Sequence, residues 1–167
     1  LKQNALYMRG WAQFKRSDYD LALLSFAQVL DQLLGSAATP EQVDAVLADI
    51  GPSKANLVKD TLRVMGLSLS YLEGAKSIVS LQTELGSRRP YEYMLYQQLG
   101  QLYLEQKRYT DSAETYQHFV QHNPASDFAP SFSIKVIDVY QEGNFPSLIL
   151  PAKQGFVERY GISSSYW

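Results

Sequence analysis

The sequence contains no cysteine, so it forms no disulfide, uses no thiol nucleophile and holds no zinc through cysteine ligands. It also has no excess of basic residues, since 15 Lys and Arg stand against 17 Asp and Glu and the net charge is −2. Affinity for nucleic acid depends on basic side chains that displace counterions. No apolar run approaches the roughly 20 residues that cross a bilayer. We therefore expect neither a nucleic-acid partner nor a membrane span in this segment.

Motifs of catalysis are missing as well. The sequence has no Gly-x-Ser-x-Gly turn for a serine nucleophile and no glycine-rich loop followed by Lys for a phosphate. Its only two histidines, His118 and His122, are close neighbours. We expect a protein that is not an enzyme and that uses no cofactor.

One set of side chains could bind a metal ion. Glu114, His118 and His122 are spaced by four residues, so on a helix they share a face, and two imidazoles with a carboxylate can ligate zinc or nickel. The alternative is the polar stripe that an outer helix shows to solvent. A convex helix surface seldom supplies the second shell that a metal site needs. We predict no metal site and keep these three residues as the one candidate set.

Apolar residues recur at helical spacing throughout the chain, with Gly, Pro, Asn and Asp between the runs. The pair Thr39-Pro40 has the order of an N-cap followed by the first residue of a helix. With 46% hydrophobic residues among 167, the chain can bury a sizeable core. The pattern predicts an all-α fold with helices at about 4–16, 19–34, 40–50, 54–72, 75–85, 91–106, 109–122, 129–141 and 145–160.

A repeated pattern is clearest between Tyr91 and Pro124. It reads Tyr96-x-x-Leu99-Gly100-x-x-Tyr103, followed by Ser112-Ala113, Tyr116 and Pro124. In a helix pair Gly100 permits close approach of the second helix, and Pro124 ends that helix. This segment resembles the tetratricopeptide repeat, whose pattern is W-x2-L-G-x2-Y, A-x3-F and P. The resemblance implies a right-handed helical solenoid of antiparallel helix pairs.

Other copies of the pattern are less regular. Gly10 aligns with Gly100, with Arg9 in place of the usual leucine, and two poorer copies follow Gly51 and Phe128. We expect a single tetratricopeptide-like domain over residues 1–167, a fragment of a longer protein. Its repeats are expected at about 3–36, 54–86, 91–126 and 129–162, with one inserted helix at about 40–50.

The resemblance also implies a function. The family binds peptides or partner helices on a concave face lined by the first helices of the pairs. By register, that face would hold Tyr7, Trp11, Phe14, Met94, Gln97, Gln101, Leu104, Ile137 and Tyr140, which Arg63 and Tyr71 could join. The alternative is that these rings pack on a neighbouring helix. We expect a protein-interaction scaffold; a rigid spacer or self-association module without a groove ligand is the competing hypothesis.

Two further features bear on context. The segments after Phe119-Val120 and Phe156-Val157 resemble junctions in tetratricopeptide proteins of bacterial cell envelopes. This implies a periplasmic or envelope-associated assembly, with the cytoplasm as the alternative. The doublet Arg88-Arg89 lies in a predicted loop. Its two alternative interpretations are solvated charge and a clamp on an acidic partner, since arginine binds carboxylates bidentately.

Overall fold

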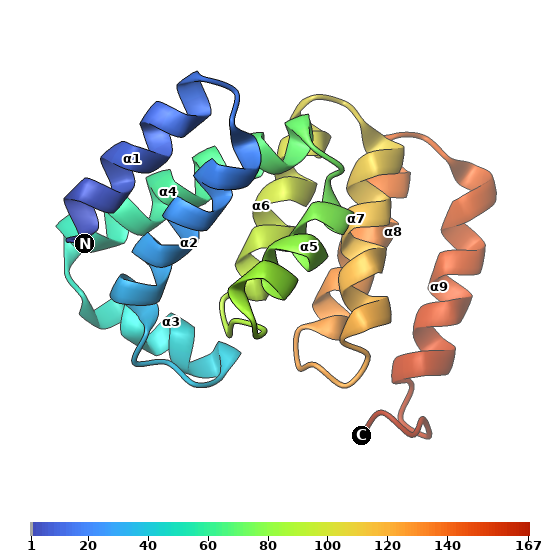
Figure 1. The fold of residues 1–167 in the computed structure, drawn as a ribbon. Coiled ribbons are helices and arrows are strands. Elements are labelled where there is room, and N and C mark those ends of the chain that lie inside the picture. Colours follow the sequence, from blue (N-terminus) through green and yellow to red (C-terminus); the bar gives the residue numbers. More distant parts are fainter. Residues whose placement is uncertain (1) are drawn as a thin grey trace. The chain divides into compact units, whose positions relative to one another are not determined.

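The computed structural model describes residues 2–167, and Leu1 lies outside the described residues. These residues form nine α-helices and no strand, so all nine predicted helices are confirmed within a few residues at each end (Figure 1). The helices are α1 (Gln3–Lys15), α2 (Tyr19–Leu34), α3 (Pro40–Asp49), α4 (Pro52–Tyr71), α5 (Ala75–Leu85), α6 (Glu92–Glu105), α7 (Tyr109–His122), α8 (Ala129–Glu142) and α9 (Pro146–Tyr160).

The start of α3 shows how local sequence sets a helix boundary. The Thr39 side chain accepts a hydrogen bond from the backbone N–H of Gln42 at 3.4 Å, and Pro40 occupies the first turn. Proline suits that place because its missing N–H would have no helical partner there. The N-cap predicted from Thr39-Pro40 is therefore confirmed.

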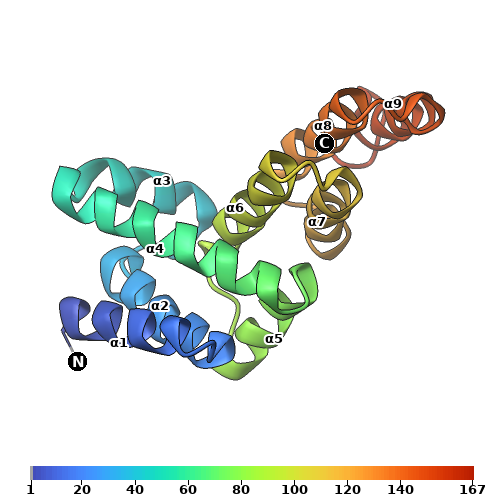
Figure 2. The same ribbon diagram turned by 90° about the horizontal axis from the view of Figure 1, so that it is seen from above.

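The chain divides into two compact units, one ending at Leu99 and the other running from Gly100 to Trp167, so the boundary falls within α6. In the first unit α2 packs against both α1 and α4 (Figure 2). In the second unit α8 packs against both α7 and α9 (Figure 1). Each unit has its own apolar core, around Phe26 and Met65 in the first and around Tyr116 and Phe132 in the second. The single domain over residues 1–167 stays a prediction.

Two helix pairs close over a glycine. A Cβ atom added at Gly10 would lie 2.7 Å from the Phe26 ring, and one added at Gly100 would lie 2.5 Å from the Cζ atom of Tyr116. The Ser112 hydroxyl also donates a hydrogen bond to the carbonyl oxygen of Gly100 at 2.8 Å. The close approach expected at Gly100 is therefore confirmed, and the same arrangement holds α1 on α2.

The pair α4 and α5 departs from this arrangement. Gly66 of α4 faces Gln98 of α6, whose Cγ atom would lie 2.8 Å from an added Cβ. Helix α5 makes few contacts with α2 and α4. The poor register expected for the second repeat thus has a structural counterpart, because the glycine of α4 opens that helix toward α6 instead of toward α5.

Candidate functional site

The first unit carries a group of aromatic rings, which we call the aromatic surface: Tyr7, Trp11 and Phe14 of α1, Tyr19 of α2 and Tyr71 of α4. The rings follow one another at centroid distances of 6.3 Å for Tyr7–Trp11, 5.6 Å for Trp11–Phe14, 6.3 Å for Phe14–Tyr71 and 5.0 Å for Tyr71–Tyr19. Edge-to-face and tilted rings at such distances attract one another. The three predicted residues of α1 therefore lie together, beside the predicted Tyr71.

Polar side chains fix this surface between α1 and α4. The Tyr7 hydroxyl donates a hydrogen bond to Asp60, which also accepts one from Arg63 at 2.8 Å. The Arg63 guanidinium lies 5.9 Å from the Trp11 ring centroid, within reach of a cation–π interaction. Burial disfavours the charged form of Asp60, but the hydrogen bonds from Tyr7 and Arg63 outweigh it and hold the pKa of Asp60 below its usual value.

Part of the aromatic surface is open to solvent. Tyr71 is 57% exposed, and Tyr7, Trp11, Phe14 and Tyr19 are half-buried. Rings that are half-buried and held by their neighbours can contact a partner with little loss of side-chain freedom. Asp60 and Tyr19 were not predicted to belong to this surface. Asp60 lies three residues before Arg63 and Tyr19 lies at the start of α2, so helical spacing was the only signal in the sequence for either residue.

The other predicted site residues have varied surroundings. Gln97 and Gln101 are exposed on α6, and the Gln101 amide donates to Glu105 at 3.3 Å. Leu104 is half-buried. Met94 and Ile137 are each only 9% exposed, which leaves little of either side chain for a partner. In the first unit the structure brings Tyr7, Trp11 and Phe14 together. In the second unit Gln101 and Leu104 are close only along α6, about one turn apart.

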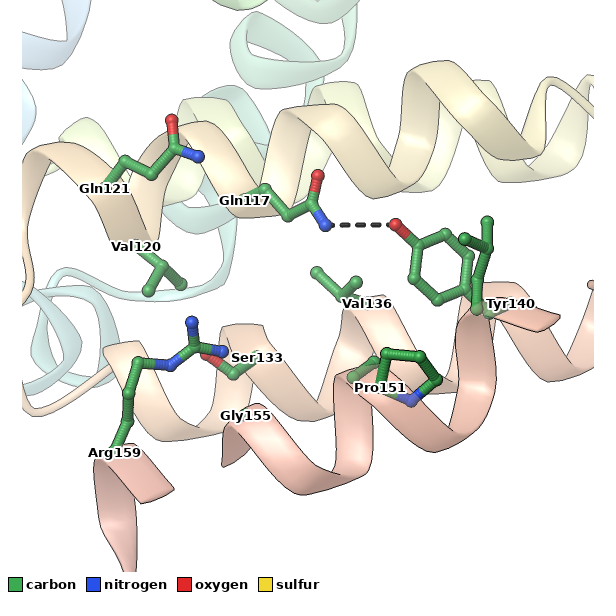
Figure 3. A pocket seen from close by; sticks show the side chains of 11 residues that line it. Gln117, Val120, Gln121, Ser133, Val136, Tyr140, Pro151, Gly155 and Arg159 are labelled. Carbon is green, nitrogen blue, oxygen red and sulfur yellow. Dashed lines mark hydrogen bonds between the residues drawn. The ribbon is translucent and has the colours of Figure 1, made fainter. Parts of the chain in front are cut away.

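Tyr140, the remaining predicted residue, lines a groove in the second unit. Helices α7 and α9 form its walls and α8 its floor, and its volume is about 350 Å³ (Figure 3). The Tyr140 hydroxyl accepts a hydrogen bond from the Gln117 amide at 3.0 Å across the groove. A second compartment of about 570 Å³ adjoins it and shares Val120, Gln121 and Arg159 as lining residues.

The candidate metal ligands do not form a site. The rings of His118 and His122 stack at 4.0 Å, and Nδ1 of His122 donates a hydrogen bond to the His118 carbonyl oxygen at 2.9 Å. Within residues 2–167, no three His, Asp or Glu side chains are grouped so that they could hold a metal ion. Glu114, His118 and His122 are therefore a row on the surface of α7.

The arginine doublet binds carboxylates of its own chain. Arg88 pairs with Glu92 at 2.9 Å, and Arg89 pairs with Asp31 of α2 at 3.0 Å. The buried Tyr91 hydroxyl donates to the same carboxylate at 2.8 Å, and burial together with the charge of Asp31 raises the pKa of Tyr91. Arg89 thus fastens the segment between α5 and α6 to the last turns of α2.

Nothing in the described helices suggests a membrane span: between residues 2 and 167 none combines the necessary length with sufficient apolar character.

Antiparallel helices that pack in succession, with a glycine under an aromatic ring in two of the pairs, define a helical repeat protein. The model of the tetratricopeptide repeat matches residues 4–32, which hold α1 with most of α2, and residues 95–126, which hold most of α6 with α7. Neither the curated proteins nor the solved structures gave a match to this chain. The tetratricopeptide family is typically non-catalytic, and its repeats indicate a scaffold for protein–protein interaction.

Proposed function

We propose that this protein is a non-enzymatic scaffold that holds a peptide or a helix of a protein partner against the first helices of its pairs. The aromatic surface of the first unit is the observation that carries this proposal. It combines an exposed ring, Tyr71, with the half-buried rings of α1. Aromatic residues and arginine contribute most of the binding energy at many protein interfaces.

The ion pair at this surface supports the same function. Arg63 holds Asp60 through two nitrogen atoms, at 3.2 Å and 2.8 Å, while Asp60 holds Tyr7. The rings and charges are therefore arranged before a partner arrives, and preorganisation reduces the entropy lost on binding. In the second unit, taken by itself, the exposed Gln101 and the half-buried Leu104 of α6 are the candidate polar and apolar contacts.

A bacterial envelope-associated assembly is the context that we propose for this scaffold. The support is the similarity of the segments after Val120 and Val157 to junctions in envelope proteins of the same repeat class. Fractionation of cells that express the protein tests it: recovery in periplasmic or membrane fractions supports the proposal, and recovery in the cytosol contradicts it.

A rigid spacer that associates with a second copy is the competing function. Its support is the outer side of α9, where Leu150 is 62% and Val157 is 66% exposed. Apolar side chains that stand one above the other on a helix can form a contact between copies. Sedimentation of Leu150→Ser beside the unaltered chain decides this: concentration-dependent dimers that the substitution abolishes support the spacer.

Photo-crosslinking tests the scaffold directly. A benzoylphenylalanine residue in place of Tyr71 lies on the aromatic surface, and one in place of Val79, which is 40% exposed on α5, is a matched control outside it. We expect one partner to be captured from position 71, not from position 79, and to be lost when Trp11→Ala is added. Equal capture at both positions, or capture that survives Trp11→Ala, contradicts the proposal.

A further inference from the structure

The groove between α7 and α9 exists where a helix pair lacks its aromatic ring. In two earlier pairs an aromatic ring lies over a glycine, Phe26 over Gly10 and Tyr116 over Gly100, at the same sequence separation. In the last pair the two residues at this separation are Val136 on α8 and Ala152 on α9, and both line the groove. The small side chain is therefore on the second helix, α9, and not on the first. Volume that a ring fills in the earlier pairs is left open here.

Arg159 supplies the charge of this groove. It lies on α9, one turn after Gly155, and a Cβ atom added at Gly155 would lie 3.7 Å from an Nη atom of Arg159. The guanidinium thus turns back along α9 toward the groove, as Figure 3 shows, while the residue stays exposed to solvent. Of the described side chains that line this compartment, Arg159 is the one that carries a full charge.

No carboxylate of residues 2–167 pairs with Arg159. Among the described residues, its guanidinium contacts the ring of its neighbour Tyr160, with the Cζ atom 5.8 Å from the ring centroid. Glu158 lines the adjoining compartment, where it does not form an ion pair with Arg159 in the described structure. Arg63, Arg88, Arg89 and Arg108, in contrast, each bind a carboxylate. An arginine in a groove with an unused guanidinium favours a ligand that brings a carboxylate.

The opposite wall offers groups that suit a peptide backbone. Gln117 and Gln121 stand one turn apart on α7, and the Gln121 amide forms no hydrogen bond with another described residue. Four residues of a helix rise by about 6 Å, and two residues of an extended chain advance by about 6.6 Å. The Gln121 amide and the side-chain carbonyl oxygen of Gln117, whose nitrogen donates to Tyr140, can therefore meet alternate peptide groups of an extended segment.

Apolar side chains of the groove suit the side chains of an extended segment. An extended segment places alternate side chains into the space, and Val120, Val136 and Ala152 provide apolar contacts for them.

We propose that this groove binds an extended peptide segment in which apolar and acidic residues alternate, with one carboxylate on Arg159 and the backbone along Gln117 and Gln121. All residues of this site belong to the second unit, whereas the aromatic surface of the proposed function belongs to the first unit.

The test is a titration of the full ¹⁵N-labelled chain with a seven-residue peptide of alternating Leu and Glu, followed by NMR. Control peptides carry Gln or Lys in place of Glu. We expect the acidic peptide to shift the side-chain signals of Arg159, Gln117 and Gln121, and the Lys peptide to leave them unchanged. Absence of binding, equal binding of the Gln peptide, or shifts confined to residues outside the groove overturns the proposal.

Variants assign the effect to the groove. Arg159→Gln should weaken binding of the acidic peptide at least tenfold, whereas Lys153→Gln, which removes a cation of α9 that does not line the groove, should change the affinity less than twofold. Ala152→Leu should block binding because the larger side chain extends from the α9 wall into the groove. Trp11→Ala should leave it unchanged, which separates this site from the aromatic surface. Equal losses for Arg159→Gln and Lys153→Gln would mean unspecific charge attraction and would reject the site.

Discussion

The helix pairs α6/α7 and α8/α9 differ in the residues that they carry at the same sequence separation, and only the first pair is closed there. In α6/α7 the ring of Tyr116 lies directly on Gly100, and the two helices are in close contact. In α8/α9 the corresponding residues are Val136 and Ala152, and both line an open groove. The comparison teaches that the same helix pair can be closed or open to a ligand, depending on which helix carries the bulky side chain at one position.

The largest difference in the free energy of unfolding is expected when a leucine side chain is added to each pair. Gly100→Leu places new atoms where Tyr116 already lies, which should lower the free energy of unfolding by about 3 kcal/mol through overpacking. Ala152→Leu extends into the groove and should change it by less than about 1 kcal/mol. Urea denaturation of both variants measures this. Equal destabilisation would break the comparison, because α8/α9 would then be closed as well.

The next prediction compares the stability effect of an arginine that is paired with a carboxylate with that of an arginine that is not. Arg89 is 21% exposed and holds Asp31, so Arg89→Met should cost about 1–2 kcal/mol by leaving a partly buried carboxylate without its partner. Arg159→Gln should stay within about 0.5 kcal/mol, as is usual for surface positions. Guanidinium titrations of both variants measure the free energy of unfolding and so test this difference. A large loss for Arg159→Gln would show that the fold itself needs this guanidinium.

Acid should loosen the aromatic surface of the first unit. The pKa of Asp60 is lower in the folded chain than in the unfolded one, so its ion pair adds stability above the unfolded pKa of about 3.9 and loses it as the pH falls through the folded pKa. We expect Asp60→Asn to be less stable than the unaltered chain at pH 7, with the difference vanishing near pH 2. Thermal melts at both pH values measure it. A constant difference would contradict the role of the charge.

The smallest effect on stability is expected at Leu104. This side chain is half-buried on α6, so Leu104→Asp should lower the free energy of unfolding by less than about 1 kcal/mol. Its effect on partner affinity should be larger, about 1–3 kcal/mol, through loss of an apolar contact and desolvation of the new charge. A variant that unfolds as readily as Gly100→Leu would place Leu104 in the core and remove it from the binding face.

The helices could be predicted because the signals are local. Thr39-Pro40 begins α3, and Gly86, with its φ of 82°, ends α5 in a conformation that other residues rarely adopt. Repeat spacing also predicted the approach over Gly100, since Tyr116 follows it at the family's separation. These features depend on neighbours along the chain, and one sequence is enough to see them.

The sites were harder to predict because they depend on contacts between distant residues. The ring of Tyr19 and the carboxylate of Asp60 join the aromatic surface only once α1, α2 and α4 are packed. Arg89 was an open choice between solvated charge and a clamp, and its partner Asp31 is far away in sequence. The groove arises from missing volume at Ala152, and an absent side chain leaves no motif to find.

The affinity of the captured partner for two variants of α1 tests the central claim most directly. Trp11→Ala removes the middle ring of the aromatic surface, and Met8→Ala removes a side chain that is 70% exposed on the same helix but belongs to none of the ring contacts. Fluorescence anisotropy should show at least a tenfold weaker affinity for Trp11→Ala, with Met8→Ala within twofold of the unaltered chain. Equal affinities for all three proteins would contradict the assignment of partner binding to this surface.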